Sequence, residues 1–172
     1  MGANLKSRDV DGCTALHYAT RGAYLGTVSI LLERGADVNA REKTGKTALH
    51  LAATGVILRS AVEDPALDRS DLRDPCARPN IEVARALIDS GAHVDSKDDD
   101  GNYPLHLAAF YEEEGIVRLL IAAGVSPTSP NRIGRIPEDG IGTNSQLSAS
   151  PAKRERIRQL LRAGMTVAGD PE

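Results

Sequence analysis

The sequence predicts an all-α solenoid, in which helix–turn–helix units stack side by side and are joined by hairpin-like turns. The first observation behind this fold class is a four-residue phrase, Thr14-Ala15-Leu16-His17, which returns with the same residues at positions 47–50. A third copy stands at 103–106, and a worn copy begins at Ile136, so that the last interval equals the first. The interval between the second and third copies is longer, because it contains one period and an insertion. A period of about 33 residues indicates a repeat architecture.

Two further markers keep the same frame. A glycine precedes each copy of the phrase at a constant distance, at positions 2, 35, 91 and 124. A turn segment that ends in glycine precedes each copy more closely, at 9–12, 42–45, 98–101 and 131–134. Three markers in one register indicate internal repeats, each of which buries its apolar face against its neighbours. With four Tyr, one Phe and no Trp, the core must consist of Leu, Ile, Val and Ala.

The two helices of a unit are clearest in the first repeat. The glycine-containing turn leads to Thr14, which is expected to cap a short helix with a small apolar surface. A second helix is predicted from the i, i+3, i+4 spacing of Val28, Leu31 and Leu32. This helix should end at Gly35, because glycine readily takes the left-handed conformation that follows many helices.

The period and the repeated phrase resemble those of the ankyrin-repeat family over about residues 2–164, two inserted stretches excepted. Residues 2–10 match the tail of a repeat whose helices are missing, so we expect a part of a larger array, rather than a small protein that begins within a repeat. The resemblance implies a single domain over 1–172: the tail at 2–10, repeats at 11–40, 41–97 and 98–130, a degenerate capping repeat at 131–164, and a C-terminal tail at 165–172.

Three repeats depart from the family pattern. In the second, residues 54–79 separate the two helices, and the part from 64 onward is predicted to form an exposed loop. In the third, Glu112 and Glu113 stand where the family usually has Gly-His, which predicts an irregular turn or a longer first helix. In the fourth, Gly140 discourages a normal first helix. An amphipathic last helix is predicted over 151–163, with the polar outer side that a capping repeat requires.

Composition argues against several classes of function. The net charge is −3 and the isoelectric point about 5.8, unlike the basic domain of a general nucleic-acid binder. The sequence contains no run of 18 apolar residues, so no membrane span is predicted. Cys13 and Cys76 lack metal-type spacing, which favours reduced thiols in the cytoplasm or nucleus. The prediction is an intracellular protein, monomeric by itself, that binds no nucleic acid, inserts into no membrane and needs no cofactor.

The resemblance implies that another protein binds to the turn tips and to the exposed side of the first helices. Many of these positions could equally be solvated turn residues. Mapped onto this sequence, the face should contain Arg8, Val10, Asp11, Cys13, Arg21, Arg41, Lys43, Thr44, Lys46, Thr54, Asp99, Asp100, Asn102, Phe110, Tyr111, Arg132, Ile133 and Arg135.

Phe110 and Tyr111 are the strongest candidates on this face. Aromatic side chains dominate the energetics of many protein interfaces, and these two stand at positions that the family leaves variable and exposed. The alternative is that Phe110 packs beneath the inserted segment. The face is also expected to carry a charge gradient, from basic residues in the first two repeats to acidic residues at 98–100 and 112–114.

No catalytic or metal-ligating residues are predicted. His17, His50 and His106 share one family position, where the imidazole is expected to bridge a turn to the adjacent repeat. They occur once per repeat, so they do not form a ligand cluster. The acidic run at 98–100 lacks the remaining ligands of a calcium loop.

The predicted function is therefore non-catalytic recognition of a protein, as an adaptor, scaffold or inhibitor. Two alternatives stay open at this point. The chain could be the targeting or regulatory domain of a larger enzyme, channel or ubiquitin-ligase adaptor, as the uncapped first repeat suggests. Alternatively, the insertion at 54–79 could fold against Phe110 and Tyr111 to form a small-molecule or catalytic site.

Overall fold

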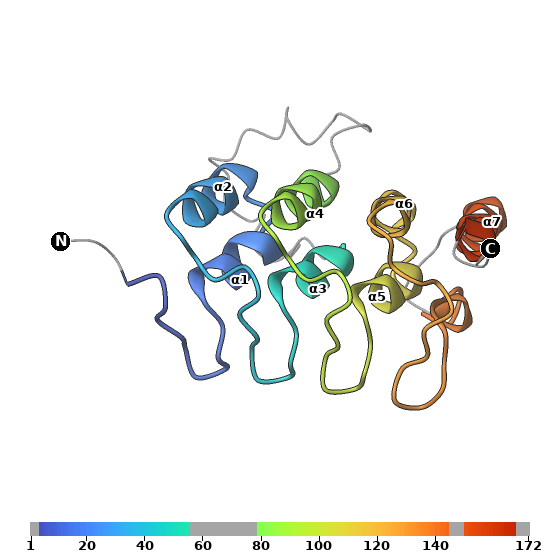
Figure 1. Ribbon diagram of the computed structural model, residues 1–172, viewed down its shortest axis with the longest axis horizontal. Helices are drawn as coiled ribbons and strands as arrows, with labels where there is room; N and C mark the ends of the chain where they lie inside the picture. Colours follow the sequence, from blue (N-terminus) through green and yellow to red (C-terminus); the bar gives the residue numbers. More distant parts are fainter. Residues whose placement is uncertain (1–3, 56–78, 145–149, 168–172) are drawn as a thin grey trace.

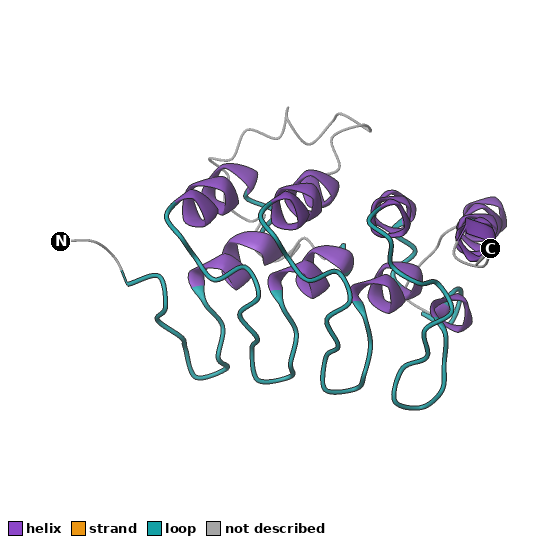
Figure 2. Ribbon diagram, viewed as in Figure 1, coloured by secondary structure: helices purple, strands orange, loops and turns teal. Residues whose placement is uncertain are grey.

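The computed structural model describes residues 4–55, 79–144 and 150–167, which form the predicted stack of helix pairs (Figure 1). These residues contain helices, turns and loops but no strand, so the all-α fold class is confirmed (Figure 2). The expectations for residues 56–78 of the insertion lie outside the described residues. The elements are α1 (Ala15–Arg21), α2 (Leu25–Glu33), α3 (Ala48–Ala53), α4 (Pro79–Asp89), α5 (Pro104–Phe110), α6 (Glu114–Ala122), the 3-10 helix η3 (Pro137–Gly140) and α7 (Pro151–Val167).

The elements form two parallel rows, as Figure 1 shows. The inner row consists of α1, α3, α5 and η3, and each member packs against the next. The outer row consists of α2, α4, α6 and α7, again in consecutive contact. Four long turns project from the inner row, at the bottom of the view in Figure 1. The repeats therefore present their turns on one side of the stack and their second helices on the other.

The core repeats from unit to unit because the same positions are apolar in each. Leu16, Leu49 and Leu105 are the leucines of the repeated phrase, and each is 2% exposed or less. Burial of one such side chain contributes about 1.5–3 kcal/mol. Ile157 and Leu161 of α7 are also fully buried and complete the core at the last repeat.

The helices of the first repeat begin and end where the sequence predicts. Thr14 stands at the N-cap of α1, and Gly35 follows α2 with a φ of 81°. In the third repeat α5 ends at Phe110, so the expectation of a longer first helix is wrong. Glu112 instead takes a φ of 56°, close to the 54° of Ala23 at the equivalent place in the first repeat.

The fourth repeat is degraded in the predicted way, but its last helix is longer than predicted. The four-residue helix η3 replaces a full inner helix. The helix α7 continues past residue 163 to Val167, and Gly164 lies within it beside Ile121 of α6. A Cβ atom at Gly164 would lie only 3.0 Å from Cγ2 of Ile121, so glycine permits this close approach.

Ion pairs attach α7 to the third and fourth repeats. The predicted charge gradient on the turn face is wrong for Glu112, which is fully buried, and Glu114 forms ion pairs with Arg118 and Arg156. Glu112 lies in the left-handed turn, and its side chain contacts a cation from α7. The pairs are Arg154 Nε with Glu112 Oε1 at 2.7 Å, Arg156 Nε with Glu114 Oε2 at 3.1 Å, and Arg162 with Glu138 at 2.6 Å.

Candidate functional site

One polar side chain closes each of the four turns, by accepting backbone N–H groups two and four residues further along. Asp98 Oδ1 accepts from Asp100 at 3.0 Å and from Asn102 at 2.8 Å. The same oxygen of Asn131 accepts from Ile133 and Arg135. Asp9 and Glu42 play this part in the first two turns. The acidic run at 98–100 therefore begins with a turn-forming carboxylate, in agreement with its interpretation as a turn.

Backbone hydrogen bonds join the tip of each turn to the next. The N–H of Lys43 donates to the carbonyl of Asp11 at 2.9 Å. The N–H of Asp99 donates to Thr44, and that of Arg132 to Asp100, at 3.0 and 3.1 Å. The four tips are thus held in one register, which limits the ordering entropy that a partner would have to overcome on binding.

The three histidines of the repeated phrase bridge neighbouring turns, which confirms their predicted structural role. In His50, Nδ1 accepts the N–H of Thr47 at 3.2 Å, so Nε2 carries the proton and donates to the carbonyl of Asn102 at 3.1 Å. His17 and His106 repeat this arrangement with the turns that follow them. Burial lowers the pKa of all three imidazoles, which favours this neutral form.

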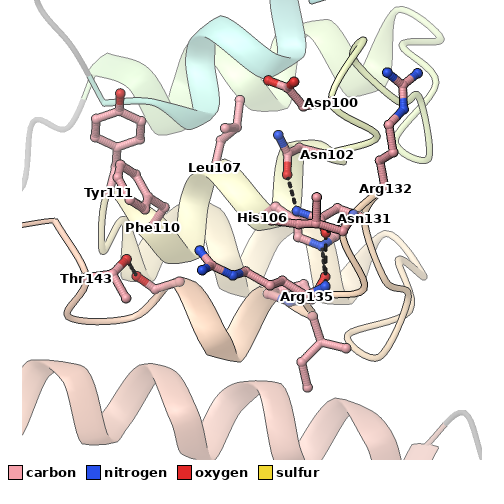
Figure 3. Close-up of a pocket in the computed structure, with 14 residues that line it drawn as sticks. Asp100, Asn102, His106, Leu107, Phe110, Tyr111, Asn131, Arg132, Arg135 and Thr143 are labelled. Carbon is pink, nitrogen blue, oxygen red and sulfur yellow. Dashed lines mark hydrogen bonds between the residues drawn. The ribbon is translucent and has the colours of Figure 1, made fainter.

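A hollow of about 360 Å³ lies between the third and fourth repeats (Figure 3). Its walls come from the third and fourth turn tips, from α5 and from η3. The apolar part of the lining is formed by Leu107, Phe110, Ile136 and Pro137. The rings of Phe110 and Tyr111 stack edge to face, with centroids 5.1 Å apart. A volume of this size lies at the small end of the range for ligand sites, roughly 300–1,000 Å³.

Charged groups occupy the rim of the hollow. The guanidinium of Arg135 extends toward Phe110, whereas that of Arg132 points away from it, and Asp100 stands on the opposite side (Figure 3). The backbone of Arg135 is fixed at both polar groups, because its N–H donates to Asn131 and its carbonyl accepts from His106. Its side chain therefore projects from a rigid base.

The predicted site residues of the last two repeats gather at this hollow. The sequence placed them on separate elements, and the fold brings seven of them together: Asp100, Asn102, Phe110, Tyr111, Arg132, Ile133 and Arg135. Phe110 packs against η3, where a Cβ atom at Gly140 would lie 3.4 Å from its own Cβ. The alternative contact of Phe110 with the insertion concerns residues outside the described ones.

The predicted residues of the first repeat have more varied surroundings. Val10 is 82% exposed at the turn tip, but Cys13 is only 5% exposed and offers little surface to a partner. Arg8 donates to the carbonyls of Gly12 and Arg41, so it links two turns. The guanidinium of Arg21 lies 5.8 Å from the centroid of the Tyr18 ring.

The predicted residues of the second repeat lie at its exposed turn, except for Thr54. Lys43 reaches the exposed Asp11 at 4.0 Å, and Lys46 donates to the Thr44 hydroxyl. Asp99, from the third turn, pairs with Arg41 at 3.4 Å. Thr54 ends α3, where its hydroxyl donates to the carbonyl of Leu51 at 2.7 Å.

Several lining residues of the hollow were not foreseen. Leu107 stands in α5 at the position that Tyr18 occupies in α1. A comparison of these two equivalent positions was the sequence signal that Leu107 belongs to the exposed side of its helix. Asn131 belongs to the turn segment at 131–134, for which the sequence predicts a turn and no contact with a partner. Pro137, Gly140 and Thr143 line the hollow only because η3 replaces a full helix, which the sequence pattern did not place in space.

Within 4–55, 79–144 and 150–167, no three histidine, cysteine or acidic side chains are grouped in a way that could hold a metal ion. None of the helices in these ranges is long and apolar enough to cross a membrane.

Comparisons with known proteins agree with the repeat frame. The family models described as ankyrin repeats match residues 1–61 and 76–121, which together are more than half of the chain. A 58-residue stretch is 41% identical to protein fem-1 homolog C of Danio rerio, and a 60-residue stretch is 43% identical to protein fem-1 homolog A of Bos taurus. A 56-residue stretch is 36% identical to the ankyrin repeat and LEM domain-containing protein 1 homolog of Caenorhabditis elegans.

These relatives are much longer than the matched stretches. Each match covers 33–34% of this chain and only 8–9% of the relative.

Proposed function

Since this chain belongs to the ankyrin-repeat family, whose members are generally non-catalytic interaction modules, we propose that it recognises a partner protein through its turn tips and the adjoining side of its inner row. In this role the chain is an intracellular adaptor, scaffold or inhibitor. The free thiol of buried Cys13 is consistent with a reducing compartment.

The hollow between the third and fourth repeats is the observation that most supports this proposal. It combines partly buried aromatic side chains with an adjacent rigid row of tips, which are the features that interface anchor points share. The contact surface proposed here consists of Arg8, Val10, Asp11, Arg21, Lys43, Thr44, Lys46, Asp99, Asp100, Asn102, Phe110, Tyr111, Arg132 and Arg135.

Rigid presentation is the proposed mechanism. The tips are joined by backbone hydrogen bonds and the histidines hold neighbouring turns together, so little conformational entropy is lost when a partner binds. Specificity then comes from the side chains on the tips, since the four turns share one pattern of backbone hydrogen bonds.

The proposal is tested by affinity capture of partners from a lysate of the native host, with the full chain immobilised. The double variant Phe110→Ala/Tyr111→Ala should lose the partner that the wild type retains, because truncation of an anchor side chain costs about 2 kcal/mol or more. Tyr24→Ala is the matched control: Tyr24 is 49% exposed in the first repeat, away from the hollow, and its variant should retain the partner.

Circular dichroism must show equal helicity for all three proteins. Equal capture by all three would contradict a contact surface centred on Phe110 and Tyr111.

A further inference from the structure

We infer that the hollow binds an extended segment of the partner in which a carboxylate side chain lies beside a bulky apolar side chain. This inference rests on the function proposed above and specifies the chemistry of the partner. The apolar side chain enters the hollow beside Leu107 and Phe110, and the carboxylate meets the guanidinium of Arg135.

The pattern of ion pairs among the arginines supports a carboxylate in the ligand. From the third repeat onward, five arginines of the described chain each lie within 3.8 Å of a glutamate: Arg118, Arg154, Arg156, Arg158 and Arg162. Arg132 and Arg135 form no ion pair with the residues that the structure describes. The two arginines at the hollow thus keep their charges available to a ligand. Arginine favours carboxylates because its planar head group can donate two parallel hydrogen bonds.

The lining of the hollow supports an apolar side chain next to that carboxylate. Phe110 and Leu107 are only partly buried although they stand on a packed inner helix. Ile133, at the tip of the fourth turn, is 70% exposed and adds apolar surface at the mouth. Covering this surface would remove apolar area from water, which contributes about 25 cal/mol per Å².

The backbone around the hollow favours recognition through side chains. The N–H of Arg132 and the carbonyl of Asp100 already bond to each other, and the N–H and carbonyl of Arg135 are both engaged. These groups are not open to pairing with an added strand. We therefore expect side chains to contribute most of the contacts with the partner segment, which makes the sequence of the segment decisive.

The distribution of charge favours a peptide over a nucleic acid. Asp100 stands on the rim opposite Arg135 and forms no ion pair within the described residues, so a polyanion laid across the hollow would meet a like charge. The whole chain also carries a net charge of −3. A single carboxylate placed at the arginine side avoids this repulsion.

Fluorescence polarisation with defined peptides tests the inference on the full chain. The probes are labelled peptides with blocked ends, in which a central leucine is flanked by two glutamates within a glycine–serine background. Matched probes replace the glutamates by glutamine or lysine, or the leucine by alanine. We expect the Glu-Leu-Glu probe to bind about tenfold more tightly than the glutamine and alanine probes, with the lysine probe weakest. Its affinity should fall as salt is added.

Charge reversal sharpens the test. The variant Arg132→Glu/Arg135→Glu should bind the glutamate probe at least tenfold more weakly than the wild type does, and it should bind the lysine probe more tightly. Arg34→Glu is the control, because Arg34 is exposed at the end of α2 and forms no ion pair with described residues. This control should bind the probes as the wild type does. Thermal melting must show that both variants are folded.

Each outcome decides for or against the inference. Tighter binding of the glutamate probe, inverted by charge reversal, supports it. Equal binding of the glutamate and lysine probes overturns it, as does the absence of binding at about 1 mM protein. Displacement of the glutamate probe by an oligothymidylate at low salt also counts against a peptide-specific site. A partner lost from Phe110→Ala/Tyr111→Ala but retained by the charge-reversed variant would overturn the inference and leave the proposed function intact.

Discussion

The junction between the first two repeats differs from the junction between the last two in its inner row. At the first junction α1 packs against α3, and both are regular α-helices. At the last junction α5 packs against η3, which has only four residues. The charges at the tips differ as well. Lys43 and Arg41 face acidic partners on adjacent turns, whereas Arg132 and Arg135 have none among the described residues.

This difference shows how a repeat array can gain a local hollow by losing part of one element. The fourth turn keeps its geometry although its helix is short, because Asn131 closes the turn and His106 bridges to it. The missing helical turn leaves space beside Phe110, and the row of tips is not disturbed. Degradation of a repeat therefore changes the surface without breaking the stack.

The largest expected effect is on the core that both junctions share. Leu105 is fully buried in α5, which packs against α3 on one side and η3 on the other. Leu105→Ala should lower the free energy of unfolding by about 2–5 kcal/mol, measured by urea denaturation. Leu16→Ala in α1 is the comparison, and it should cost less because α1 has only one described neighbour in the inner row. A loss below about 1 kcal/mol for Leu105→Ala would contradict this account.

The regular part of this architecture could be predicted from the sequence because it repeats. The phrase at 14–17 recurs with the same apolar and capping residues, so one local solution serves for each repeat. The bridging role of His50 followed from the family resemblance, because the imidazole stands at a position where the family has a structural bridge. The burial of Cys13 did not follow, because a position next to a turn tip can face either the solvent or the adjacent repeat.

A second prediction concerns the ion pairs that hold α7 at the last junction. Arg154→Ala leaves the buried carboxylate of Glu112 without its cation, so it should cost about 3 kcal/mol. Arg156→Ala is the matched control on the same helix: its side chain is 54% exposed, and loss of its pair with Glu114 should cost less than about 1 kcal/mol. Both values follow from urea denaturation, and hydrogen exchange should show faster opening of α7 in the first variant. Equal costs would contradict the buried pair as an attachment point.

The contact between Glu112 and Arg154 could not be predicted, and the reason is physical. The two residues are 42 positions apart in the sequence. The family usually has a glycine at the position of Glu112, and glycine has no side chain that could form an ion pair. The sequence indicated only that Glu112 was unusual there. Likewise, the hollow depends on the short helix η3 standing in place of a full inner helix, and no periodic pattern specifies where η3 lies in space. The residues that depart from the repeat thus carry the features that sequence reasoning missed.

A third prediction uses the pH dependence of the bridging histidines, which occur at both junctions. Burial lowers their pKa below the ordinary value of 6.5, so the unfolded chain binds protons more readily than the folded chain. Stability should therefore be full above about pH 6.5 and fall as the pH drops below it, well before most carboxylates titrate. The measurement is the urea midpoint between pH 7.5 and 5. His50→Asn should reduce this dependence, because it removes one of the three buried imidazoles whose pKa is lowered. A midpoint that does not change with pH would contradict the neutral bridge.

The smallest expected effect on stability comes from glycine substitutions in two turns that share one backbone conformation. Ala23 and Glu112 both have a positive φ, 54° and 56°, where residues with a Cβ atom are strained by about 1–2 kcal/mol. Ala23→Gly relieves this strain, and the gain is partly offset by the greater entropy of glycine in the unfolded chain, so a net stabilisation of about 0.5 kcal/mol is expected. Glu112→Gly relieves the same strain but removes the partner of Arg154, so it should destabilise the protein. Thermal melting of the two variants measures the contrast. If both stabilise the protein, the glutamate contributes nothing at the last junction; if both destabilise it, strain at these turns is too small to matter.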